Sequence, residues 1–384
     1  MTIDTQEIPQ YSHLPPPDLA SWQLSCALKS QLIDLIAQHA APISFATFMD
    51  RLLYTPQLGY YQNAGYKFGQ RGDFTTAPEL SPLFGYAVAQ ACLPLLNALP
   101  QFDMLEFGAG SGQLCVDMLN ALHAAGHQPT HYYIVETSAE LRQRQQDKLR
   151  QHPELYSCVT WLTQLPTSPI NGIVIANEVL DAMPVHRVSA DVEWGVGLHD
   201  NNAFCWQSMP FSCAKLEKTV TRLNLPPDMI SEVNLSIKPW LRSIAHCLAR
   251  GSVILIDYGF PRHEFYHPTR IDGTLMCHYQ HRAHADPFCY PGLQDITAHV
   301  DFTAVAEAAV ACGLSVCGFT TQGLFLLANG ITTQLDADSD LASKQALRVL
   351  TEPQEMGELF KVIALSKDMP SPRGFELRDM RARL

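Results

Sequence analysis

The sequence predicts an α/β protein of the Rossmann-like class, built on a mostly parallel sheet with crossover helices. Short apolar runs alternate with segments of helical periodicity from residue 102 onward. A glycine-rich turn follows the first apolar run, and acidic residues end several of the later ones. At 384 residues the chain exceeds the roughly 100–200 residues of a typical domain, so we expect further segments around this core.

The core is expected to continue from residue 102 to residue 368. Each apolar run is short enough for a buried strand, and each helical segment is long enough to cross back over the sheet. The expected strands are 104–107, 132–136, 172–176, 252–257, 314–319 and 359–366. The expected helices are 113–125, 139–150, 237–249 and 301–312.

Other segments depart from this alternation. We expect a disordered tail at 1–20 and a flexible tail at 369–384, because both are rich in polar residues. Residues 21–101 form an N-terminal segment with helices at 25–40 and 43–53 and a long ordered loop at 58–84. Residues 187–234 alternate polar and apolar positions between turn residues, which predicts an inserted antiparallel element. An accessory segment follows at about 260–300.

The charge of the chain restricts its partners. The formal net charge is −12, and no long run of Lys and Arg offsets it. Such a charge repels phosphate backbones, so we expect no nucleic-acid partner. A basic peptide or protein is compatible with it.

Cysteine usage and the N-terminal sequence predict a cytoplasmic protein. The eleven cysteines are scattered without a repeated CxxC pattern, which indicates reduced thiols. Residues 1–20 have neither the order of a signal peptide nor the Arg-rich character of a transit peptide. No run of about 18 apolar residues is present, so we expect no membrane insertion. The sequence does not indicate the oligomeric state.

The glycine-rich turn predicts a site for S-adenosylmethionine (SAM). Glu106 ends the first core strand, and Gly108, Gly110 and Gly112 follow at alternate positions. Glycines allow a positive φ and a close approach of backbone to ligand. The G-x-G-x-G order differs from the G-x-G-x-x-G of dinucleotide folds, and a carboxylate suits the cationic methionyl end of SAM better than a pyrophosphate.

A second acid completes the expected cofactor site. Glu136 ends the next strand, where a carboxylate can accept hydrogen bonds from two ribose hydroxyls. The cofactor-binding residues are therefore expected to be Glu106, Gly108, Gly110, Gly112 and Glu136. The alternative is that the glycines form only a tight turn and that Glu136 is an ordinary surface acid.

An acidic loop after the next strand is the candidate catalytic segment. Asn177, Glu178 and Asp181 lie in it, and the carboxyl ends of parallel strands line one crevice. If the acceptor is a guanidinium, the two carboxylates can bind it and orient one of its nitrogens. The alternative is that they only cap a helix, since acids favour a helix N-terminus.

With these residues in view, the chain resembles the MidA-like family of SAM-dependent methyltransferases, which includes the mitochondrial complex I assembly factor that methylates arginine. The resemblance extends from about residue 58 to residue 329, plus the last strand. The matching pieces are Gly59-Tyr60-Tyr61, 72–79, 105–112, 175–184, 256–259 and 291–302. The family often has Pro and then Arg inside the glycine turn, where this chain has Ala109 and Ser111.

The resemblance implies a class I SAM-dependent methyltransferase core, SAM as cofactor and a protein arginine as acceptor, such as one on a respiratory complex I subunit. It also implies that Asp73, Glu79 and Tyr258 lie around the substrate. Two alternatives stay open, methylation of a small molecule and a SAM-binding assembly chaperone without turnover.

A cluster of potential metal ligands lies between residues 277 and 289. The segment contains Cys277, His278, His281, His284 and Cys289. Their order fits no common zinc template, so we expect loop packing or substrate contact and no metal site. Whether this segment binds a metal stays open on the sequence alone.

Overall fold

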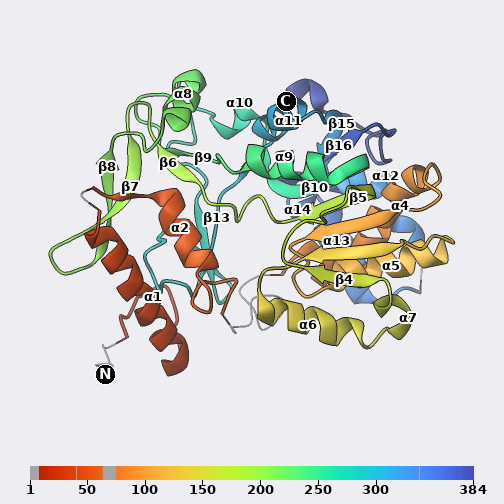
Figure 1. Ribbon diagram of the computed structural model, residues 1–384, viewed down its shortest axis with the longest axis horizontal. Helices are drawn as coiled ribbons and strands as arrows, with labels where there is room; N and C mark the ends of the chain where they lie inside the picture. The colour runs from red at the N-terminus through yellow and green to blue at the C-terminus, as the bar shows by residue number, and fades with distance from the viewer. Residues whose placement is uncertain (1–7, 40, 64–74, 337) are drawn as a thin grey trace. The chain divides into compact units, whose positions relative to one another are not determined.

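The computed structural model describes residues 8–39, 41–63, 75–336 and 338–384, which form two compact units (Figure 1). The core unit comprises Thr75–Met183, Leu235–His267 and His299–Leu384. The accessory unit comprises the described residues of Met1–Phe74 together with Pro184–Asn234 and Pro268–Ala298. Three stretches that are far apart in the sequence thus share the accessory unit.

A central sheet organises the core unit. Its strands are β2 (Asp103–Phe107), β3 (His131–Val135), β4 (Val159–Leu162), β5 (Ile170–Asn177), β10 (Leu248–Phe260), β14 (Val300–Asp301), β15 (Ser315–Thr321) and β16 (Phe360–Lys367). The order is β15-β16-β10-β5-β2-β3-β4, and β14 pairs with β10. Strands β4, β3, β2, β5 and β10 are parallel, whereas β16 is antiparallel to both of its neighbours. The predicted α/β class is confirmed.

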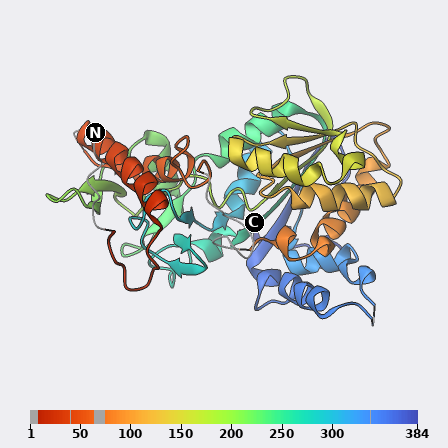
Figure 2. The same cartoon turned by 90° about the horizontal axis from the view of Figure 1, so that it is seen from below.

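Helices lie on both faces of this sheet (Figures 1 and 2). They are α3 (Ala77–Leu80), α4 (Pro82–Leu96), α5 (Gln113–Ala124), α6 (Ala139–Leu149), α7 (Pro153–Tyr156), α9 (Ile237–Cys247), α10 (Arg262–Phe265), α11 (Phe302–Ala311), α12 (Gln322–Ala328), α13 (Leu341–Thr351) and α14 (Met356–Leu359). Short 3-10 turns occur at η1 (Ile331–Gln334) and η2 (Arg381–Arg383). Successive strand residues point to opposite faces, so Met104 packs with α4 and α5 while Leu105 packs with α9 and α11.

The accessory unit contains two small antiparallel sheets. Its elements are α1 (Leu19–Ala37), β1 (Ile43–Ser44), α2 (Phe45–Tyr54), β6 (His186–Val188), β7 (Glu193–Leu198), β8 (Phe204–Met209), α8 (Ala214–Leu223), β9 (Ser231–Val233), β11 (Met276–Tyr279), β12 (Arg282–His284) and β13 (Asp295–Thr297). Strand β7 pairs with β1, β6 and β8, and β6 pairs with β9. Strand β11 pairs with β12 and β13. The inserted antiparallel element predicted at 187–234 corresponds to β6–β9 and α8.

Local hydrogen bonds explain where the N-terminal helices begin. The carboxylate of Asp18 accepts the backbone N–H of Ser21 at 2.8 Å, so α1 begins at Leu19, earlier than the predicted residue 25. The hydroxyl of Ser44 accepts the N–H of Thr47 at 3.1 Å and caps α2. The predicted loop at 58–84 is interrupted by α3 and by the start of α4.

The described parts of both predicted tails make contacts with the rest of the chain. Leu14 is buried, and Pro9 accepts a hydrogen bond from the Tyr290 hydroxyl at 3.0 Å. At the other end, Phe375 and Met380 are buried, and the N–H of Met380 donates to the Phe319 carbonyl at 2.6 Å. Apolar anchors therefore order both segments despite their polar composition. Among the described helices, none combines the length and the apolar character needed to cross a membrane.

Candidate active site

The candidate site lies at one edge of the core sheet, where four parallel strands end. In register, Phe107 at the end of β2 pairs with Val135 of β3 and with Ala176 of β5. The last residue of β5, Asn177, pairs with Ile256 of β10. Strands β3 and β4 lie on one side of β2, and the later strands β5 and β10 lie on the other side. Ligands of open α/β sheets bind beside the point where the strand order reverses in this way. The glycine turn and the acidic loop therefore share this edge.

The glycine turn has the backbone that its sequence predicts. Gly108, Gly110 and Gly112 have φ values of +62°, +53° and +84°, which L side chains rarely adopt. A Cβ on Gly108 would lie 2.8 Å from a methyl carbon of Val179 in the acidic loop. Gly108 thus lets the turn and the acidic loop approach each other closely, whereas a Cβ on Gly112 would face Gln145 on α6.

Glu106 is more buried than the sequence suggests. Its side chain is on the α4 and α5 face of the sheet, and the residue is 2% exposed. The hydroxyl of Tyr132 donates to its Oε2 at 2.7 Å. Burial raises the pKa of Glu106 to about 7, although the Tyr132 hydrogen bond opposes this shift.

Glu136 is held by a residue that sequence reasoning missed. Its Oε1 accepts the N–H of Ser138 at 2.8 Å, and its Oε2 accepts the amide of Gln145 at 3.1 Å. The same amide donates to the Gly110 carbonyl at 3.0 Å. The indole N–H of Trp161 donates to Oε1 of Gln145 at 2.9 Å. Burial raises the pKa of Glu136. Gln145 thus ties the glycine turn to the second acid.

Glu79 lies at the glycine turn. Its carboxylate accepts a hydrogen bond from the hydroxyl of Ser111, and Lys148 donates to the same hydroxyl at 3.2 Å. This contact places Glu79 at the expected cofactor site. Cofactor binding is therefore an alternative to the substrate role that the resemblance implies for Glu79. Asp73, the other acid implied from the 72–79 segment, lies outside the described residues.

Asp257 is a second residue that sequence reasoning did not assign. It is fully buried near the C-terminal end of β10, and its Oδ2 accepts the N–H groups of Val179, Leu180 and Asp181 at 3.2, 2.9 and 3.3 Å. Its Oδ1 accepts the N–H of Tyr258 at 2.9 Å. The available signal was a charge at the end of an otherwise apolar strand, since a buried acid needs a local reason.

The acidic loop brings the predicted catalytic residues together. Asp181 is 5% exposed, and it is hydrogen-bonded by the side chain of Tyr258. Burial raises the pKa of Asp181 to about 6. Asn177 donates to Glu178 Oε1 at 3.0 Å, and Glu178 has a φ of +53°. A non-glycine residue in this region is strained, and such strain is common in active-site loops.

The carboxylates of the site also repel one another. Burial raises the pKa of Asp257 well above its usual range, and the nearby carboxylates of Asp181 and Glu178 raise it further. Glu178 and Asp181 therefore place a negative potential at this end of β5 and β10. A cation bound there would lower the pKa of Asp181 and of Asp257.

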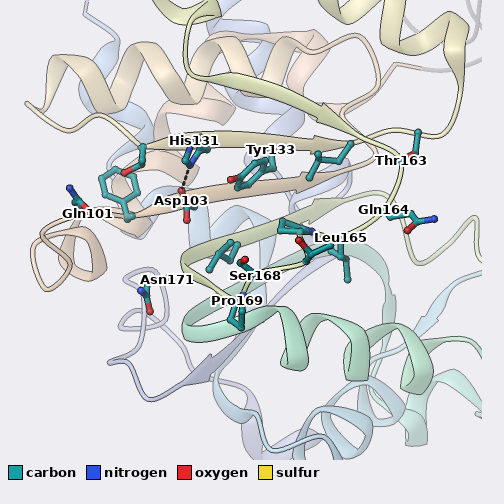
Figure 3. A pocket seen from close by; sticks show the side chains of 16 residues that line it. Gln101, Asp103, His131, Tyr133, Thr163, Gln164, Leu165, Ser168, Pro169 and Asn171 are labelled. Atoms are coloured by element: carbon teal, nitrogen blue, oxygen red, sulfur yellow. Dashed lines mark hydrogen bonds and ion pairs between the residues drawn. The ribbon is translucent and has the colours of Figure 1, made fainter.

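A separate cavity lies at the opposite ends of the strands (Figure 3). It has a volume of about 610 Å³ and is lined by Asp103 and His131, the first residues of β2 and β3, and by the β4–β5 connection. This connection, residues 163–169, contains no helix, so one face of the sheet stays less covered there. The cavity is therefore distinct from the candidate site.

A glycine turn and an acidic loop at the carboxyl ends of parallel strands are typical of α/β enzymes that bind a small cofactor there. Residues 87–320 match the model of a family described as S-adenosyl-L-methionine-dependent methyltransferase. The chain belongs to this family, and it is a SAM-dependent methyltransferase. The predicted resemblance and the predicted cofactor are thereby confirmed.

Solved structures and curated relatives agree with this assignment. A crystal structure of a superfamily member from Burkholderia thailandensis bound to S-adenosyl-homocysteine is 42% identical, with a TM-score of 0.92 over 97% of this chain and 100% of that chain. The protein arginine methyltransferase NDUFAF7 homolog, mitochondrial, of Drosophila melanogaster is 29% identical over 84% of this chain and 81% of its own length. Protein arginine methyltransferase NDUFAF7, mitochondrial, of Mus musculus is 27% identical over the same shares.

The comparisons correct one expectation. The sequence predicts a cytoplasmic protein, but the curated relatives are named as mitochondrial proteins, which contradicts that location. Cysteine usage could not have separated the two, because it reports only on redox conditions.

Proposed function

We propose that this methyltransferase transfers the methyl group to an arginine side chain of a protein substrate. The observation that carries the proposal is the acidic loop beside the glycine turn, where the carboxylates of Glu178 and Asp181 lie close enough to Asp257 to raise its pKa. A guanidinium is cationic at neutral pH and binds carboxylates bidentately. The names of the NDUFAF7 relatives support the same acceptor.

The cofactor residues of the proposal are Glu106, Glu136 and the three glycines of the turn. The positive φ values of the glycines are ones that L side chains rarely adopt, and backbone without a Cβ lets a ligand approach closely. The carboxylate of Glu136 is oriented by Ser138 and Gln145, and carboxylates at this position suit a ribose diol. Glu106 contributes negative charge below the turn, which suits the cationic end of SAM.

The chemistry needs an oriented nucleophile and an acceptor for one proton. Bound SAM would supply a methyl group on a sulfonium, and the sulfur–methyl bond would break as the nitrogen–methyl bond forms, leaving S-adenosyl-homocysteine. Glu178 and Asp181 would hold and orient the guanidinium, and one of these carboxylates would accept the proton that the methylated nitrogen loses. Asn177 orients Glu178 through its 3.0 Å hydrogen bond, and Tyr258 orients Asp181. Asp257 fixes the loop backbone that carries both acids.

The resemblance to the MidA-like family suggests the acceptor protein, a subunit of respiratory complex I. Two alternative functions differ from this one in what they do with the methyl group. A small-molecule methyltransferase would transfer the methyl group without any protein acceptor, and an assembly chaperone would bind SAM without turnover.

The test combines binding with product analysis. The full-length protein is titrated with SAM in a calorimeter, then incubated with radiolabelled SAM and an extract of cells that lack its gene. We expect a labelled protein band that yields methylarginine on acid hydrolysis. A labelled small molecule or another labelled amino acid would contradict arginine methylation, and SAM binding without any label would favour the chaperone.

Variants of the acidic loop sharpen this test. We expect Glu178→Gln and Asp181→Asn to lower methyl incorporation by about 100-fold or more, because each removes a carboxylate that acts on the acceptor. SAM affinity should change little. Glu154→Gln on α7 is the control, because its side chain is 64% exposed. Equal losses of SAM binding and methylation in the loop variants would contradict the acceptor role.

A further inference from the structure

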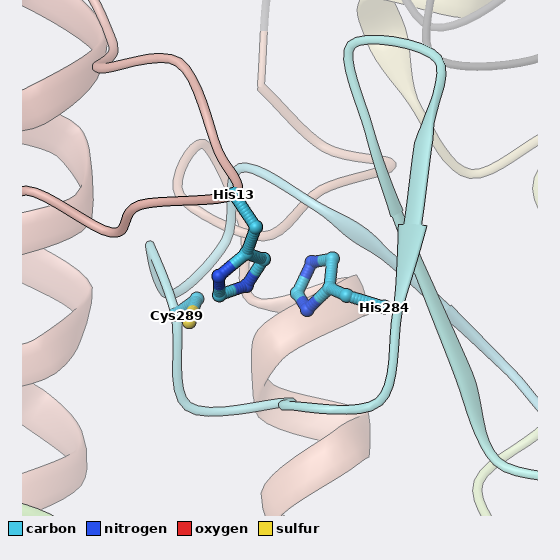
Figure 4. Close-up of side chains that lie close together, drawn as sticks. All are labelled: His13, His284 and Cys289. Carbon is cyan, nitrogen blue, oxygen red and sulfur yellow. The ribbon is translucent and has the colours of Figure 1, made fainter.

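Two imidazoles and a thiol converge in the accessory unit, away from the acidic loop in the sequence. The side-chain donor atoms of His13, His284 and Cys289 all lie within 4.8 Å of one another. The two rings are 5.4 Å apart between centroids, at an angle of 61°. Figure 4 shows the two rings side by side with the Cys289 sulfur next to His13. His13 precedes α1, whereas the other two residues end or follow β12.

The same segment contains a carboxylate that can act as a fourth metal ligand. The thiol of Cys289 donates to Asp286 Oδ2 at 3.3 Å, so this carboxylate borders the cluster. Sulfur, two imidazole nitrogens and a carboxylate oxygen form a ligand set that suits Zn²⁺ in tetrahedral geometry. The expected absence of a metal rested on residues 277–289 alone, and His13 is remote from them in sequence.

One ring nitrogen of the cluster is shielded from solvent. The Nε2 atom of His284 has no partner at hydrogen-bond distance, whereas its Nδ1 atom accepts the backbone N–H of Asp286 at 3.3 Å. Nε2 is therefore the nitrogen of His284 that can bind a metal ion.

Packing holds both segments close together without a metal. Leu14 and Trp22 pack against Tyr279, Cys289 and Tyr290 in a small separate core. Arg282 also donates to the His13 carbonyl at 3.1 Å. A zinc site needs donor atoms about 3.3–3.8 Å apart, given Zn–N and Zn–S bonds of about 2.0 and 2.3 Å. The donors therefore need to approach by at most about 1 Å, and rotation of the exposed His13 side chain moves its ring relative to the other two donors.

We propose that His13, His284 and Cys289, with Asp286 as the fourth donor, form a zinc site that fastens the segment before α1 to the β12 segment. When Zn²⁺ binds, the Cys289 thiol releases its proton to solvent and a sulfur–zinc bond forms. The two imidazoles bind through nitrogen lone pairs. The site stabilises the accessory unit, because the metal binds the folded cluster and not the unfolded chain.

Metal binding tests the proposal directly. The full-length protein is freed of metal with a chelator and titrated with Zn²⁺ against a chromophoric competitor. We expect one Zn²⁺ per chain, and we expect Co²⁺ to give a thiolate-to-cobalt charge-transfer band. Cys289→Ser should remove this band, and His284→Gln should remove stoichiometric binding. His13→Ala should weaken binding by about 10-fold or more, because it is a direct ligand and even outer partners contribute this much.

A control residue lies in the same hairpin. His281 sits in the β11–β12 turn with a φ of +61°, so His281→Asn keeps a residue that tolerates this backbone. It should retain one zinc per chain. The exposed position of His13 keeps the test valid even if a buried variant fails to fold, which circular dichroism would show. The proposal is overturned if the wild-type protein takes up no stoichiometric zinc or if the three ligand variants keep it. Neither result depends on methyl transfer.

Discussion

The carboxylate of Asp257, near the C-terminal end of β10, accepts the backbone N–H of Leu180 in the acidic loop at 2.9 Å. Residues Val179 and Asp181 donate to the same oxygen. One buried side chain thus fixes three successive peptides of the loop that carries the candidate catalytic acids. This relationship makes Asp257 a positioning residue for Asp181.

Asp257→Asn should reduce both stability and methyl transfer. An amide offers only one oxygen, so its NH₂ group would face an N–H donor in place of an acceptor. We expect the free energy of unfolding to fall by about 1–3 kcal/mol, the usual effect of an unsatisfied buried group. Urea unfolding and the methylation rate measure the two effects. Asp147→Asn on α6 is the control, with a side chain 58% exposed. An unchanged methylation rate would contradict the positioning role.

Gly110→Val should abolish SAM binding while the fold remains cooperative. Gly110 has a φ of +53°, where a β-branched residue is an outlier, and its side chain would occupy the expected cofactor space. Calorimetric titration measures the affinity, and thermal unfolding checks the fold. Gly126→Val imposes similar strain at a φ of +80°, with nothing within 4 Å of its Cβ. Undiminished SAM binding by Gly110→Val would rule out the assignment of the glycine turn.

Gln145→Leu should weaken SAM binding more than it slows the methyl transfer itself. The substitution removes the links from Gln145 to Glu136 and Gly110 and leaves the Trp161 indole without its acceptor. We expect a higher KM for SAM with a smaller change in kcat, together with a loss of about 1–3 kcal/mol of stability. Steady-state kinetics measure the first effect. Gln143→Leu on the exposed side of α6 is the control, and equal behaviour of the two variants would contradict the role of Gln145.

The pH dependence of methylation should reflect the buried acids. Burial raises the pKa of Asp181 from 3.8 to about 6, and the ionised form is the one that binds a guanidinium. We therefore expect kcat/KM to rise as the pH increases through about 6, with Asp181 and Asp257 titrating as a pair. The folded protein binds this proton more tightly than the unfolded chain. The contribution of Asp181 to the free energy of unfolding therefore falls as the pH rises from about 4 to about 6. Glu154→Gln should keep the wild-type profile, and a flat profile between about pH 5 and 8 would contradict the role of a buried acid.

The sequence predicted the edge of the sheet that carries the site, because parallel strands place their carboxyl ends together. Glycines and acids after β2, β3 and β5 were therefore assigned to one crevice. Gln145 and Asp257 were missed, because their hydrogen bonds join residues 35 and 77 positions apart and depend on helix and strand packing. No local pattern records such pairings.

Two parts of the fold were missed for a related reason. Helix α4 buries residues on nearly all sides, so it lacks the polar stripe that marks an amphipathic helix. The C-terminal segment is polar on average, and only its few apolar residues hold it to the core. Average composition therefore predicted a flexible tail where single side chains determine the structure.

Phe375→Ala tests whether the C-terminal segment contributes to the stability of the core. The Phe375 ring is 8% exposed, and its centroid lies 5.6 Å from that of Phe325 on α12. We expect the free energy of unfolding to fall by about 3–5 kcal/mol, the range for a buried phenylalanine replaced by alanine. Leu377→Ala is the matched control two residues away, because Leu377 is 58% exposed, and it should change stability by less than about 0.5 kcal/mol. Equal and small effects in urea unfolding would mean that the segment is the flexible tail that its composition predicts.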